Sequence, residues 1–176
     1  MKKVLFCAMA LLCAISVSAQ TKEEFQASKA RAEKLEKLAQ PKSCKIAEVD
    51  ALTTAAGTIA AESVQITPLL QGMYFRSIGE TEEGITDVTV KKPTVEELME
   101  LSGRIALQAV AVKTAAELVP AAGSALKSIK NPMQLKAPTQ AVNYGKDVLA
   151  IAGEESVFQA KAIAEMIKTA QEGDNL

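Results

Sequence analysis

Apolar residues recur at helical spacing over long segments, and this pattern restricts the fold more than any other feature of the sequence. From Ile46 to Ala60 the apolar positions lie three or four residues apart, and from Val142 to Ala170 they recur at multiples of seven. Alanine, the best helix former, is abundant, whereas aromatic residues, which favour strands, make up only 3% of the chain. The sequence therefore predicts an all-α fold.

The first helices are predicted from their capping residues. Thr21 and Glu24 have the spacing of a capping box. The helix that they open, within 20–40, has a narrow apolar stripe, so we expect an outer or arm helix. Ser43 is expected to cap a second helix that runs to about residue 65. Thr67-Pro68 is then expected to open a shorter helix, because proline is favoured at the first helical position.

A second capping box, Thr94 with Glu97, opens the most apolar helix. Its segment 105–112 is apolar nearly all round, which predicts burial at the centre of a bundle. Pro120 is expected to end this helix and to precede a short one over 121–129.

The last helical segment is predicted over 139–170 and is expected to be interrupted. Ser156 and Gln159 break its apolar seam, and Gly153 weakens the helix at the same place. We therefore expect a kink or break near Gly153.

These elements predict one helical domain over 20–176, with a frayed polar tail at 172–176. The expected architecture is a helical bundle of three long helices plus shorter proline-started helices, with one long irregular loop at about 79–93. Connections in bundles usually need only about 2–8 residues. The surplus length makes this loop a candidate interaction surface. The candidate interaction residues in this loop are Glu80, Glu82, Glu83, Lys91 and Lys92.

Residues 1–19 have the pattern of a secretory signal peptide. Lys2 and Lys3 precede an apolar stretch, and Val17-Ser18-Ala19 places small residues where a signal peptidase cleaves. The pattern is typical of bacterial export and predicts a periplasmic or extracellular protein. The longest uncharged run after the signal, 63–75, is too short to span a membrane, so we expect no stable membrane span in the mature chain.

The composition makes several function classes improbable. The chain has 20 basic and 21 acidic residues and no histidine. A balance so near zero gives no strong attraction to nucleic acid. Without histidine the chain lacks the commonest general base and metal ligand, and no glycine-rich phosphate loop or serine elbow is present. We therefore expect no enzymatic activity, no cofactor and no metal site. Glutamates such as Glu96, Glu97, Glu154 and Glu155 are interpreted as helix-capping residues instead.

Cys44 is the candidate reactive thiol, because the other two cysteines, Cys7 and Cys13, lie in the predicted signal. If Ser43 caps a helix, Cys44 lies in its first turn, where positive potential favours the thiolate. A reactive Cys44 could form a disulfide-linked dimer. In the alternative interpretation, Cys44 is a small side chain without a functional role.

Two functions remain compatible with the sequence. The first is a non-enzymatic binding or interaction module, with a protein or an apolar ligand as its partner. The alternative is a membrane-active helical protein that exposes the apolar segment 105–126.

Overall fold

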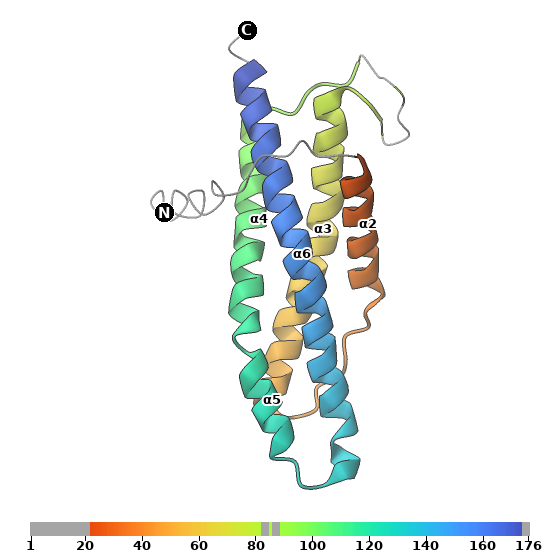
Figure 1. The fold of residues 1–176 in the computed structure, drawn as a ribbon, viewed down its shortest axis with the longest axis vertical. Coiled ribbons are helices and arrows are strands. Elements are labelled where there is room, and N and C mark those ends of the chain that lie inside the picture. Colours follow the sequence, from red (N-terminus) through yellow and green to blue (C-terminus); the bar gives the residue numbers. More distant parts are fainter. Residues whose placement is uncertain (1–21, 82–84, 86–88, 174–176) are drawn as a thin grey trace.

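A computed structural model describes residues 22–81, 85 and 89–173. The predicted signal at 1–19, Thr21 of the first capping box, Glu82 and Glu83 lie outside the described residues. Of the described residues, 82% are helical and none lies in a strand, so the predicted all-α bundle is confirmed. Four long helices pack together (Figure 1).

The four long helices lie nearly parallel to one axis, and α2 is the shortest of them (Figure 1). It covers only part of the length of α3 and packs against α3 and α6. The short helix α5 lies at the end of the bundle away from α2, beside the start of α3 (Figure 1). The elements are α2 (Lys22–Lys37), α3 (Ala47–Ile78), α4 (Val95–Ala116), α5 (Val119–Lys127), the 3₁₀ turn η1 (Pro132–Gln134) and α6 (Lys136–Gly173).

Apolar side chains fill the interior in separate clusters along the bundle. The first cluster joins α2, α3, α4 and α6, and includes Phe25, Ile66, Ile105 and Ile163. The second lies around Ala56 of α3 and Ala152 of α6, and a third packs α5 against the start of α3. At this third cluster Gly145 lets α6 approach α3 closely: a Cβ atom there would lie 2.7 Å from Leu52 Cγ.

Two local predictions are confirmed. Thr94 and Glu97 form the expected capping box: the Thr94 hydroxyl accepts from the Glu97 amide, and the Glu97 carboxylate accepts from the Thr94 amide. The expected proline-started helix is also present, with Pro120 in the first turn of α5, although α4 already ends at Ala116, before the predicted end at Pro120. Both signals depend only on neighbours in the sequence.

The predicted helix start at Thr67-Pro68 is wrong, because α3 runs without interruption through Pro68. Proline cannot donate to the carbonyl four residues earlier. The cost is outweighed by packing: Ile66 and Leu70, on either side of Pro68, are both fully buried in the first cluster. The chain therefore has one long helix where the sequence predicts two.

The predicted cap at Ser43 is also wrong. Helix α3 begins only at Ala47, after Ile46, which makes no side-chain cap hydrogen bond. Ser43 instead donates its hydroxyl proton to Asp50 over 2.6 Å, across the turn that precedes the helix. Lys45 in this turn has a φ of 61°, which no residue of a right-handed helix adopts.

The expected break near Gly153 is absent, and α6 is continuous over Lys136–Gly173. It also begins before the predicted start at residue 139. Glu155, Ser156 and Gln159, next to Gly153, all face the interior. Glycine is less favourable than alanine in a helix by at most about 1 kcal/mol. The packing of buried side chains on both sides of Gly153 outweighs this cost and keeps the segment helical.

The expected burial of 105–112 is correct on one side only. Ile105 is buried and Val112 is half-buried, but Leu107 and Val110 are 73% and 59% exposed. Helix α4 packs against α3 and α6, and its opposite face has no neighbour among the described elements. An apolar surface therefore remains on the outside of the bundle.

Replacing Pro68 with alanine restores a hydrogen-bond donor in the middle of α3. We expect Pro68→Ala to raise the free energy of unfolding by about 1–2 kcal/mol, measured by urea denaturation. Pro120→Ala is the matched control, since an amide in the first turn of α5 has no helical acceptor, and its effect should stay within about 0.5 kcal/mol. Equal effects of the two substitutions would contradict this account of α3.

Candidate functional site

A layer of polar side chains crosses the bundle between the first two apolar clusters, and all four long helices contribute to it. On each helix these residues lie between, or at the border of, the positions that belong to the two clusters. We call this set the polar layer. Its members are Ser28 and Arg31 of α2, Ser63 and Thr67 of α3, Gln108 of α4, and Glu155, Ser156 and Gln159 of α6.

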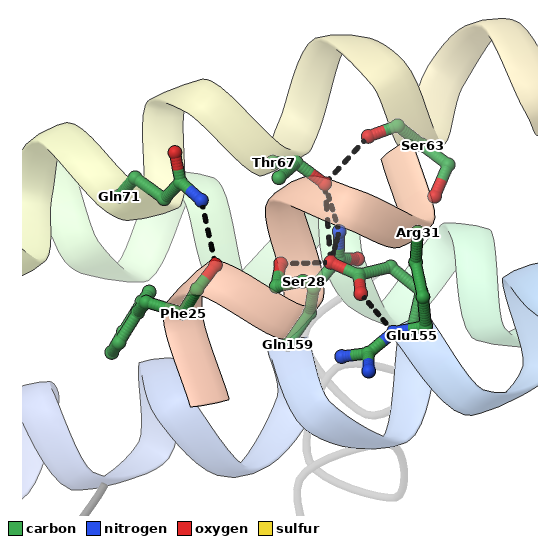
Figure 2. Close-up of polar contacts among 8 residues, drawn as sticks. All are labelled: Phe25, Ser28, Arg31, Ser63, Thr67, Gln71, Glu155 and Gln159. Carbon is green, nitrogen blue, oxygen red and sulfur yellow. Dashed lines mark hydrogen bonds and ion pairs between the residues drawn. The ribbon is translucent and has the colours of Figure 1, made fainter. Parts of the chain in front are cut away.

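The centre of the polar layer is the carboxylate of Glu155, which is 0% exposed. Its Oε2 accepts from Arg31 Nε over 2.7 Å, and its Oε1 accepts from the Ser28 hydroxyl over 2.5 Å. Figure 2 shows both α2 side chains directed at the carboxylate. Removing a carboxylate from water is costly unless it is paired and hydrogen-bonded, and α2 supplies both partners.

Helix α3 completes the surroundings of the carboxylate. Gln159 Nε2 donates to Glu155 Oε1 over 3.0 Å and lies 3.1 Å from Thr67 Oγ1. The Thr67 hydroxyl lies 3.0 Å from the Ser63 carbonyl oxygen and 3.1 Å from Glu155 Oε1. It has one proton, so it donates to one of these oxygens at a time. The network joins α2, α3 and α6 (Figure 2).

Further contacts hold α2 beside the polar layer. Gln71 of α3 donates to the backbone carbonyl of Phe25 over 2.9 Å (Figure 2). The Phe25 ring stacks on Tyr74 at 4.0 Å between centroids and meets Phe158 edge-on. The Arg31 guanidinium lies 5.5 Å from the centroid of the Phe158 ring. Helix α2 is thus fastened to both α3 and α6.

The polar layer is the site that the sequence interpretation missed. The sequence predicts that Glu155 caps a helix after a break; this prediction is wrong, because Glu155 lies in the middle of α6. The signal was present: Ser156 and Gln159 occupy buried positions of the apolar seam. Polar residues on a buried face can mark either a break or an internal network, and only the partners on α2 and α3 distinguish the two.

The second notable feature is the outward face of α4. Leu107 and Val110, with the exposed Ala111 and Thr114, form a charge-free strip of the helix surface, which we call the α4 face. Exposed apolar surface of this kind often marks an interaction site. By length and composition, Val95–Lys127 could cross a membrane, and only 22% of its most apolar stretch is buried.

The charged residues of the 79–93 loop are distributed rather than gathered. Glu80 forms an ion pair with Lys22 of α2, and Arg76 donates to the carbonyl of Lys91 over 3.0 Å. Lys92 lines an open cavity of about 500 Å³ between the start of α4 and the end of α6. Glu82 and Glu83 lie outside the described residues, so their part in an interaction surface stays a prediction.

The expected environment of Cys44 is wrong. It precedes α3 instead of lying in its first turn, and it is half-buried. Burial, followed by contact with the Asp50 carboxylate, raises the pKa of the Cys44 thiol. The structure therefore disfavours the thiolate at this position. No group of three or more acidic or cysteine side chains that could hold a metal occurs in the described part of the chain.

Comparisons of this chain with known proteins identify no related family or protein. No protein-family model, curated protein or solved structure matches the chain.

The ion pair at the centre of the polar layer can be tested by removing its positive partner. Arg31→Met leaves the Glu155 charge buried without compensation and is expected to lower the free energy of unfolding by about 3 kcal/mol or more. The double variant Arg31→Met with Glu155→Leu should recover much of this loss, because it buries no charge.

An exposed ion pair serves as the control for this experiment. Lys37 and Glu33 are 3.8 Å apart, with side chains 78% and 53% exposed. Lys37→Met should therefore change stability by less than about 0.5 kcal/mol. If Arg31→Met had an effect as small as this control, Glu155 would not depend on Arg31.

Proposed function

We propose that this protein is an exported, non-enzymatic binding module that docks on an apolar surface of a partner protein through its α4 face. The observation that carries the proposal is the exposure of Leu107 and Val110, one helical turn apart on the same side of α4. Export is supported by the signal pattern at 1–19. A non-enzymatic role is supported by the lack of histidine.

The character of the α4 face supports a protein partner. Residues 105–112 carry no charge, and the charged residues Arg104 and Lys113 flank this segment. Protein interfaces have this arrangement, in which an apolar centre is surrounded by a polar rim. The rest of α4 is held firmly: its buried side chains Leu98, Leu101 and Ile105 pack in the first cluster, so the face is presented on a rigid element.

A membrane-active role is the second candidate, favoured by one observation. Val95–Lys127, which includes α4 and α5, meets the length and composition of a membrane span, and only 22% of its most apolar stretch is buried. In that case the apolar segment 105–126 would contact lipid instead of protein.

Charged substitutions on the α4 face test the proposal. The double variant Leu107→Glu with Val110→Glu should keep its melting temperature, because both side chains are exposed. Partner capture is measured by cross-linking from a site-specific probe placed on α4. The unmodified protein should capture the partner, and the double variant should not. Val157→Glu is the matched control, since Val157 is 54% exposed on α6, and its capture should be unchanged. Equal loss of capture in both variants would contradict a specific α4 site.

Vesicle flotation separates the two candidates. The unmodified protein is expected to stay unbound to neutral phosphatidylcholine vesicles. Flotation that is abolished by Leu107→Glu with Val110→Glu would overturn the protein-partner proposal and support the membrane-active one.

The 79–93 loop provides a further comparison. Replacing residues 81–90 with a Gly/Ser linker of equal length preserves Glu80 and Lys91, whose contacts hold the ends of the loop. Partner capture through the α4 face should survive this replacement. Loss of capture with an unchanged melting temperature would assign recognition to the loop instead.

A further inference from the structure

The polar layer contains buried polar atoms whose hydrogen bonding is incomplete. Within the described part of the chain, five side-chain atoms of the layer are buried without a hydrogen-bond partner. They belong to α3, α4 and α6, and none to α2. The atoms are Ser63 Oγ, Gln108 Oε1 and Nε2, Ser156 Oγ, and Gln159 Oε1.

Buried polar groups in folded proteins are nearly always paired, since an unpaired one loses its hydration without compensation. Five such atoms within one layer of the bundle therefore need a structural explanation. Gln108 is the extreme case, because the residue is 2% exposed and both Oε1 and Nε2 of its side chain are unpaired. We therefore expect a bound molecule that forms hydrogen bonds with these groups.

The chemistry of the layer restricts what that molecule is. The Glu155 charge is already balanced by Arg31, and every unpaired group is neutral. An ion would bring an uncompensated charge into the interior. The Gln108 NH₂ needs an acceptor, the carbonyl oxygens of Gln108 and Gln159 need donors, and the two serine hydroxyls serve as either.

We propose that the polar layer is an internal hydration site, in which ordered water molecules join α3, α4 and α6. Water is neutral, donates and accepts, and is small enough for an interior where these three helices pack directly on one another. Each buried water typically makes about three hydrogen bonds, so a small number of molecules satisfies all five atoms. The hydrated side of the layer then complements the direct network that α2 forms with Glu155.

Water contact can be measured on the full chain without any substitution. In ¹⁵N-labelled protein, the side-chain NH₂ protons of Gln108 are expected to show cross-relaxation with water of the sign that marks a bound, long-lived molecule. Gln65 is the matched control, because it lies exposed on α3 and should show only the signature of fast surface water. Protected Gln108 protons without any cross-relaxation to water would overturn the proposal.

A substitution provides a second, independent readout. Gln108→Leu keeps a similar volume and removes the amide. If water satisfies the amide, the melting temperature should fall, because Ser63, Ser156 and Gln159 lose water-mediated partners. A rise would show that the amide is unsatisfied in the folded protein and would contradict the hydration site. Gln65→Leu should leave the melting temperature nearly unchanged.

Discussion

The buried contact between Glu155 and Arg31 is the interaction on which the arrangement of the bundle depends. A carboxylate without exposure requires a positive partner, and among its hydrogen-bonding partners only Arg31 is charged. This requirement selects one position for α2: a shift by one turn would remove both Arg31 and Ser28 from the carboxylate. Apolar contacts alone tolerate such shifts far better, because they are not directional. The ion pair therefore specifies where α2 lies, whatever its net contribution to stability.

The polar layer also divides the interior. Ile66, Leu98 and Ile163 belong to the apolar cluster on one side of the layer, and Leu35, Ala56 and Ala152 belong to the cluster on the other. Polar groups are thus buried in the middle of the bundle, while Leu107 and Val110 remain on its surface. Both features depart from the usual distribution of polar and apolar residues. Departures of this kind are expected where a chain is selected for more than stability.

How far the sequence predicts this structure depends on the range of each interaction. The capping box of Thr94 and Glu97 is predictable because its two partners are three residues apart. The continuity of α3 through Pro68 and of α6 through Gly153 is not, because packing against other helices outweighs local propensity there. The role of Glu155 depends on Arg31, 124 residues away. Likewise, the apolar pattern of 105–112 does not reveal that only one side of α4 has neighbours.

The central claim is that the polar layer holds α2 as an integral helix of the bundle, and native-state hydrogen exchange tests it most directly. If the claim is correct, the α2 amides next to Ser28 and Arg31 exchange only through the same opening as the α3 and α6 amides around Thr67 and Glu155, and their protection is equally high. If the α2 amides instead exchange at the rate of an unstructured peptide while α3 and α6 stay protected, α2 is a detachable arm and the account is contradicted.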